Sequence, residues 1–189
     1  MRRIGHVIGG VESADFDRIS PVYNPATGAQ TAELALASIT EIDRAVAAAK
    51  AAFEGWRLVS LAKRSAMLFA FRQQLFEHRD ELAAAITAEH GKVLSDAAGE
   101  VARGLECVEF ACGIPQLLKG GHSSQASTGV DVHELKQPLG VVAGITPFNF
   151  PAMVPLWMIP NALACGNTFV LKPSEKEPSA SMLIAELLQ

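Results

Sequence analysis

The feature that most constrains this chain is a long segment without charge, which runs from Pro138 to Leu171. Its length alone would permit a membrane span. However, prolines at 147, 151, 155 and 160 interrupt it, and asparagines at 149, 161 and 167 would need hydrogen-bond partners in hydrocarbon. We therefore interpret the segment as two buried parallel strands and the helix between them, because strands covered on both faces have continuous apolar sequences.

This segment divides into a βαβ unit. Residues 139–145 are typical of a buried strand, residues 152–165 of a helix that Gly166 ends, and residues 168–171 of a second buried strand. The crossover should be right-handed and the strands parallel, so residues 146–151 and 172–175 should emerge at the same edge of the sheet. Ligands of open α/β sheets bind at that edge. The sequence therefore predicts a site where these two loops meet.

The rest of the chain precedes this unit, apart from a last helix over residues 179–188. The first forty residues predict a small antiparallel region with a turn at 24–28. A helix should begin at Thr40, where Thr40 and Asp43 form a weak capping box, and end at Gly55. Its apolar stripe would be Ile42, Ala45, Val46, Ala49 and Phe53. Three more helical patterns, with apolar residues at 61–75, 82–86 and 97–112, complete a helical layer, and residues 121–137 predict an exposed hairpin.

The composition favours a folded protein and disfavours several functions. The chain has 189 residues, of which 49% are hydrophobic and 19% charged, with a net charge of −4. It is too apolar to be disordered, and no basic run supports nucleic-acid binding. The three cysteines lack Cys-x-x-Cys spacing and the histidines are scattered, so we expect no metal site and a reducing compartment. Because no secretory signal is recognisable, we expect a cytoplasmic location.

The two loops carry the residues suited to chemistry. In residues 146–151, the Asn149 amide could stabilise a developing oxyanion, although by residue type alone a cap on the following helix is the more common role. In residues 172–176, Lys172 and Glu175 could bind ribose hydroxyls, or they could form a solvated charge cluster. Neither standard glycine-rich phosphate-binding motif occurs in the sequence.

The same residues carry a family resemblance. The sequence QPLGVVAGITPFNFP at 137–151, followed by ACGNTFVLKPSE at 164–175, resembles the cofactor-binding region of the aldehyde dehydrogenase superfamily. Phe148 before Asn149, together with VPLWM at 154–158, is similar to the CoA-acylating methylmalonate-semialdehyde dehydrogenases of that superfamily. The segments YNPATG at 23–28, EHGK at 89–92 and GEVARGLE at 99–106 agree. The resemblance covers nearly the whole chain but only the N-terminal part of the family, whose members are more than twice as long.

The resemblance implies specific roles. Asn149 would donate its amide to the oxyanion hole, while Thr146 and Phe148 would line the cofactor cleft. Lys172 and Glu175 would bind the adenosine ribose, with Lys176 beside them. The Glu175 carboxylate would repel a 2′-phosphate, so NAD is expected rather than NADP. Arg103 would hold the substrate carboxylate, or it could instead pair with Glu100 or Glu106 on its own helix.

The resemblance also implies the architecture and the activity. The expected fold is an incomplete α/β, aldehyde-dehydrogenase-like fold: residues 1–120 would be strands and helices of the cofactor domain, 121–137 an oligomerisation hairpin, and 138–189 the start of a Rossmann-like NAD-binding sheet. The catalytic domain would be absent. The whole enzyme, an expected homotetramer, would oxidise methylmalonate or malonate semialdehyde to an acyl-CoA with loss of carbon dioxide.

The nucleophilic Cys of the family is missing from this chain. Cys112 and Cys165 fall on apolar helical positions and are expected to be structural, whereas Cys107 is less clearly placed. The chain alone is therefore expected to lack turnover. The alternative is a non-catalytic, truncated relative that acts as a NAD-binding or oligomerisation module.

Overall fold

The computed structural model describes residues 1–13 and 17–189. Strands open the chain, namely β1 (Arg2–Ile4), β2 (His6–Ile8), β3 (Val11–Ser13), β4 (Ile19–Asn24) and β5 (Ala29–Ala35). The helical layer follows, with α1 (Ile39–Trp56), α2 (Leu61–Glu77), α3 (Arg79–His90), α4 (Leu94–Cys112) and the short α5 (Ile114–Leu117). The remaining elements are β6 (His122–Ser127), β7 (Val130–His133), β8 (Val141–Ile145), α6 (Met153–Ala164), β9 (Thr168–Lys172) and α7 (Pro178–Leu187).

The N-terminal strands form a mixed arrangement. β4 and β5 pair antiparallel around the turn at residues 25–28, and β2 pairs antiparallel with β3, as the sequence predicts. However, β1 pairs parallel with β5, so the expectation of a purely antiparallel region is wrong. Other strands lie between β1 and β5 in the sequence, and this long connection allows the two strands to run parallel. The residues of a local turn could not predict such a pairing.

The first helix begins earlier than expected and buries less of its stripe. Ser38 is the N-cap, and its side chain and the Glu41 side chain form a reciprocal capping box, so the expected box of Thr40 and Asp43 is wrong. Thr40 lies within the first turn, because the helix starts at Ile39. Ile42 is 51% exposed and Val46 is 42% exposed, so the stripe faces solvent along one side in the described part of the chain.

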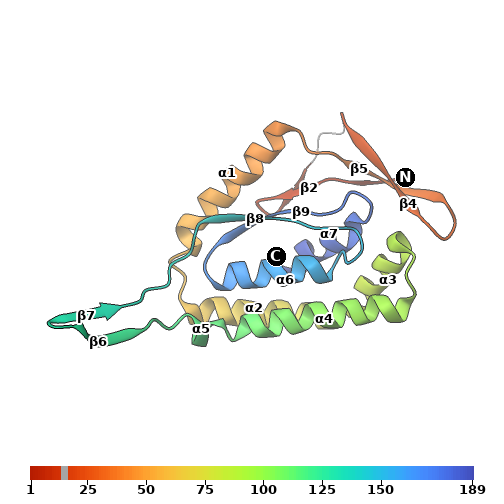
Figure 1. The fold of residues 1–189 in the computed structure, drawn as a ribbon. Coiled ribbons are helices and arrows are strands. Elements are labelled where there is room, and N and C mark those ends of the chain that lie inside the picture. The colour runs from red at the N-terminus through yellow and green to blue at the C-terminus, as the bar shows by residue number, and fades with distance from the viewer. Residues whose placement is uncertain (14–16) are drawn as a thin grey trace.

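The βαβ unit is confirmed. β8 and β9 pair in parallel, with Val141 opposite Thr168 and Ile145 opposite Lys172. Helix α1 packs against this sheet on one side and α6 on the other (Figure 1). The strands are nevertheless not buried throughout: Ile145 is 80% exposed, because the sheet has two strands in the described residues and no element covers that end of β8.

The main core lies between helices. Fully buried side chains from α2, α3, α4, α6 and α7 form one cluster, among them Leu75, Leu82, Val101, Leu156 and Ile184. The apolar face of α4 is therefore its packing face against α6, as its periodicity predicts. This core fixes the position of α6, and with it the loop that enters α6 from β8.

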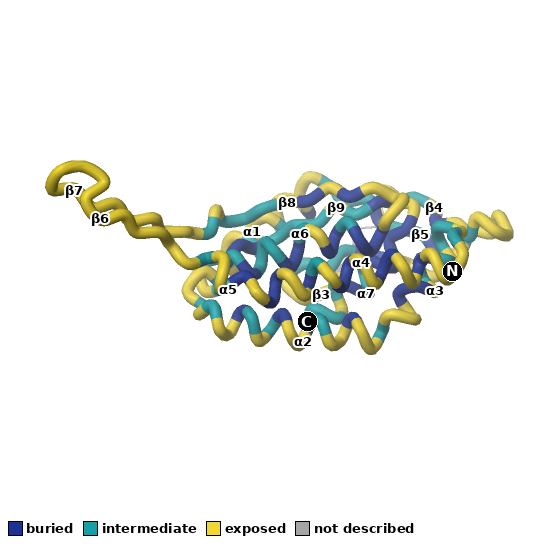
Figure 2. Tube along the Cα trace, turned by 60° about the horizontal axis from the view of Figure 1, so that its bottom comes forward, coloured by how far each residue is buried: buried dark blue, intermediate teal, exposed yellow. Residues whose placement is uncertain are grey.

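The expected hairpin projects from the body. Every residue of β6 and β7 is exposed (Figure 2), and the rings of His122 and His133 stack across the two strands with centroids 4.5 Å apart.

Among the helices in the described ranges, none combines the length and apolar character that a bilayer crossing requires.

Candidate functional site

The loops after β8 and β9 meet, as the βαβ topology predicts. The backbone N–H of Thr146 donates to the carbonyl of Lys172 at 3.1 Å. The Lys176 ammonium lies 4.5 Å from the centre of the Phe148 ring, within the range of a cation–π contact. Two segments that are far apart in sequence therefore form one continuous surface at this edge of the sheet.

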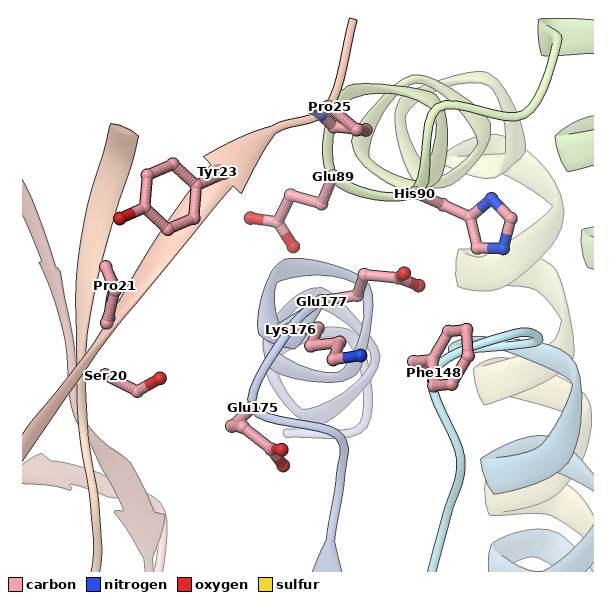
Figure 3. A pocket seen from close by; sticks show the side chains of 10 residues that line it. All are labelled: Ser20, Pro21, Tyr23, Pro25, Glu89, His90, Phe148, Glu175, Lys176 and Glu177. Carbon is pink, nitrogen blue, oxygen red and sulfur yellow. The ribbon is translucent and has the colours of Figure 1, made fainter. Parts of the chain in front are cut away.

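A pocket of about 530 Å³ opens beside this contact. Phe148, Glu175, Lys176 and Glu177 line one side of it. The end of α3, strand β4 and the turn after β4 line the rest (Figure 3), through Ser20, Pro21, Tyr23, Pro25, Glu89 and His90. The pocket thus includes Phe148, Glu175 and Lys176, which are expected to bind a cofactor. Its lining also holds four titratable side chains to which the sequence analysis gave no role, namely Tyr23, Glu89, His90 and Glu177.

Lys172 and Glu175 form an exposed ion pair. The Lys172 Nζ is 3.1 Å from the Glu175 Oε2, and the two side chains are 60% and 46% exposed. Hydrogen bonds from the backbone at Glu175 and from the Lys172 side chain lower the pKa of Glu175, so this carboxyl is ionised at neutral pH. An ionised carboxylate beside an ammonium offers both an acceptor and a donor for vicinal hydroxyl groups.

Asn149 presents its side chain to solvent. The residue is exposed, and within the described part of the chain no hydrogen bond occupies its amide group. The N-cap of α6 is Ala152, which has no capping side chain, so the alternative that Asn149 caps this helix is wrong. The Glu100 carboxylate performs the capping from α4, because its Oε1 accepts the N–H groups of Ala152 and Met153 at 2.9 and 3.2 Å.

Four of the seven expected site residues lie outside the pocket lining, namely Thr146, Asn149, Lys172 and Arg103. Thr146 is only 4% exposed, and its buried Oγ1 has no hydrogen-bond partner among the residues that the structure describes. The Arg103 side chain is 70% exposed and its Nε is 3.4 Å from the Glu106 Oε2, which is the same-helix pair that the sequence allows. In the described residues, no hydrogen bond or ion pair connects Arg103 with the two loops.

The cysteines lie in unreactive surroundings. Cys112 is buried, and Cys107 and Cys165 are half-buried. Burial raises the pKa of all three thiols above its ordinary value, and neighbouring Glu106 and Glu109 add to the effect at Cys107 and Cys112. Because the thiolate is the nucleophile, a raised pKa is the opposite of what a catalytic cysteine needs.

Sequence reasoning missed the charged groups beneath the loops. Lys92, Glu100 and Glu177 are largely buried, and Glu177 is only 4% exposed. Burial raises the pKa of Glu177 to about 7, while burial and the nearby Lys92 lower the pKa of His90. The only available signal was that Lys92 and Glu100 stand in the segments 89–92 and 99–106, which take part in the family resemblance.

Comparison with known proteins assigns the family. Residues 11–189 match the aldehyde dehydrogenase family, so the chain belongs to that family. It is 50% identical to a malonate-semialdehyde dehydrogenase of Pseudomonas aeruginosa over 187 residues, which is 99% of this chain and 38% of the relative. The chain therefore spans about two fifths of the length of the curated relatives it matches.

Solved structures agree. A methylmalonate-semialdehyde dehydrogenase from Oceanimonas doudoroffii superposes with a TM-score of 0.97 at 51% identity, covering 100% of this chain and 39% of that one. A Sinorhizobium meliloti protein assigned to the same activity, solved with NAD, gives 0.96 at 44% identity, with coverage of 100% and 38%. An NADP-dependent enzyme of E. coli gives 0.94 at 31% identity, with coverage of 99% and 39%.

Proposed function

We propose that this chain is the N-terminal portion of an NAD-dependent, CoA-acylating methylmalonate- or malonate-semialdehyde dehydrogenase. The observation that carries the proposal is the meeting of the two loops, with the Lys176 ammonium 4.5 Å from the Phe148 ring centre and the exposed Asn149 amide next to it. The relatives named for these semialdehydes support the substrate class. In this proposal the chain supplies an oxyanion donor and part of a cofactor site.

Asn149 acts on the aldehyde oxygen. In the whole enzyme, a thiolate from another part of the protein forms a bond to the aldehyde carbon, and the carbonyl π electrons move to oxygen. The Asn149 side-chain N–H donates a hydrogen bond to that oxygen and stabilises its negative charge. Bound NAD supplies the hydride acceptor. Loss of hydride from the tetrahedral carbon would leave a thioester on the cysteine. The substrate carboxylate would then leave as carbon dioxide, while its bonding electron pair stays on the α-carbon, which takes up a proton. The CoA thiol, losing its proton, would displace the cysteine thiolate and carry away the acyl group.

The residues of the β9 loop suit an adenosine ribose. Glu175, ionised at neutral pH, would accept hydrogen bonds from the ribose hydroxyls, and the Lys172 ammonium would donate hydrogen bonds to their oxygens. Phe148 and Lys176 would line the adjoining cleft, and Thr146 would support it from beneath. A 2′-phosphate placed near the Glu175 carboxylate would be repelled, so NAD should bind more tightly than NADP.

Calorimetry with NAD on this chain tests the assignment. We expect Lys172→Ala and Glu175→Ala each to weaken NAD binding by about tenfold or more, because each removes a charge-assisted hydrogen bond. Glu109→Ala is the matched control for Glu175, since Glu109 is also in an exposed ion pair, with Arg72, and is 51% exposed. Unchanged NAD affinity in both loop variants would overturn the ribose assignment.

The choice of dinucleotide has its own test. Glu175→Gln keeps the shape of the side chain but removes its charge, so NADP binding should strengthen relative to NAD. Equal affinity of the wild-type chain for the two dinucleotides would contradict the proposed role of this carboxylate.

A turnover assay separates binding from catalysis. With malonate semialdehyde, NAD and CoA, this chain should form no NADH, because none of its three cysteines stands in the sequence context of the family's nucleophile, and burial raises the pKa of each thiol. NAD binding without turnover is the result expected of a chain that carries the cofactor-binding residues but not the nucleophile. NADH formation that survives Asn149→Ala would show that the chain works by another mechanism.

Two further roles belong to the same proposal. Arg103 would bind the substrate carboxylate through its exposed guanidinium, in exchange for its 3.4 Å contact with Glu106.

The projecting hairpin of β6 and β7 would belong to the oligomer interface of a tetrameric whole enzyme. Size-exclusion chromatography of the chain with and without residues 121–137 tests the hairpin: loss of self-association on deletion is the expected result, and unchanged association would exclude this role.

A further inference from the structure

We propose that Lys92 and Glu100 are positioning residues that fix the loop carrying Asn149. This inference rests on the proposed role of Asn149 as the oxyanion donor. Neither residue touches the pocket; both act through the backbone of the segment between β8 and α6.

Glu100 holds the helix end of the loop. Its side chain is 1% exposed on the face of α4 that packs against α6. One carboxylate oxygen accepts the N–H groups of Ala152 and Met153, which are the first free donors of α6. A negative charge at a helix N-terminus is favourable, and here it comes from a different helix.

Lys92 holds the middle of the loop. Its Nζ is 2.7 Å from the second Glu100 oxygen, donates to the carbonyl oxygen of Asn149 at 2.9 Å and lies 4.6 Å from the centre of the Phe150 ring. The Lys92 side chain is 11% exposed. The Lys92 ammonium therefore contacts both the Asn149 carbonyl and the Glu100 carboxylate that caps α6.

The two contacts restrain the loop at both ends of a short segment. The carbonyl of Asn149 is fixed by Lys92 and the amide of Ala152 by Glu100. Pro151 removes further backbone freedom between them. The side chain of Asn149 is left exposed on a fixed backbone, which is what a preorganised hydrogen-bond donor requires.

The energetics favour positioning over stability as the role of the pair. A buried ion pair gives little net stability, because the cost of removing both charges from water offsets their attraction. Well-packed apolar residues of similar size are often equally stable in its place. What such residues cannot provide is the hydrogen bonds to Asn149, Ala152 and Met153.

The double variant Lys92→Met and Glu100→Leu separates the two roles. We expect the double variant to unfold cooperatively, with a thermal midpoint no higher than that of the wild type, because the apolar pair removes two buried charges but leaves the N–H groups of Ala152 and Met153 without an acceptor. The amides of Ala152 and Met153 should exchange with solvent at least tenfold faster, and the backbone ¹⁵N order parameters of Phe148 to Phe150 should fall. The control is Arg72→Met with Glu109→Leu, which removes an exposed ion pair between α2 and α4 and should leave the loop signals unchanged.

Unchanged exchange and order parameters in a folded double variant would overturn the proposal. Should the double variant fail to fold, the same measurements on Glu100→Gln decide. This substitution is nearly isosteric, but it removes the charge and turns one acceptor oxygen into an NH2 donor, so Lys92 and the amides of α6 cannot both keep their acceptor. Faster exchange at Ala152 and Met153, or lower order parameters at Phe148 to Phe150, supports positioning, and wild-type values of both contradict it. These readouts need neither NAD nor turnover, so a failure of the proposed function to bind NAD would be seen separately.

Discussion

The buried Glu177 carboxyl should make the stability of the fold depend on pH. The residue is 4% exposed, and its Oε2 has no hydrogen-bond partner within residues 1–13 and 17–189. Burial is the main reason why its pKa rises from 4.5 to about 7. Lys92 and Lys176 oppose this rise, while Glu89 and Glu100 add to it. His90 also lines the pocket that Glu177 faces.

The sign follows from proton binding. Between pH 4.5 and about 7, the folded state keeps a proton that the unfolded state has lost. The contribution of Glu177 to the free energy of unfolding is therefore complete below pH 4.5 and declines up to about pH 7, where the group ionises in the folded protein. At about 1.36 kcal/mol per pH unit, this range corresponds to about 3 kcal/mol.

Glu177→Gln removes the titration and keeps the shape of the side chain. The variant should be more stable than the wild type at pH 8 by about 2 to 3 kcal/mol, and the difference should vanish near pH 4.5. Urea unfolding at pH 5, 6, 7 and 8 measures this difference. His90 is present in both proteins, so its own contribution cancels, whereas the interaction of Glu89 with Glu177 is part of the measured difference. Parallel pH profiles for the two proteins would refute the reasoning.

Two other predictions concern packing. In α4, Gly104→Ala should lower the free energy of unfolding by about 1 to 3 kcal/mol, because the new Cβ would lie 2.6 Å from the Leu156 Cδ1. Gly99 is exposed on the same helix, and a Cβ there would meet no described atom within 4 Å. Gly99→Ala should therefore raise the free energy of unfolding by about 0.5 to 1 kcal/mol. Arg64→Leu should destabilise by about 1 to 3 kcal/mol, because the guanidinium is buried and donates to the carbonyl of Ala164 at 2.8 Å, which would lose its partner. Thermal and urea unfolding check each value; equal effects at the two glycines, or a neutral Arg64→Leu, would contradict them.

The helices and the βαβ unit could be predicted from the sequence because their signals are local. The period of apolar residues in α2, α3 and α4 and the left-handed Gly91 and Gly166 at helix ends are properties of neighbouring residues. The edge at which the two loops meet followed from the rule that parallel strands end on the same side.

The remaining features depend on contacts between distant residues. Glu100 caps a helix whose first residues are 52 and 53 positions away, so no sequence spacing could reveal it. The exposure of Ile42 and Ile145 depends on which elements cover them, which an apolar pattern does not specify. The competing role of Asn149 as a helix cap could be rejected only once Glu100 was seen in that place.

The central claim is that the loops after β8 and β9 form one dinucleotide site. The most direct measurement is a titration of the ¹⁵N-labelled chain with NAD, followed by the backbone amide resonances. The account predicts that the amide resonances of residues 148–150 and 172–176 shift with the same dependence on NAD concentration. The amide resonances of residues 122–133 in the hairpin should stay unchanged. Shifts confined to one loop, or none at saturating NAD, would contradict it.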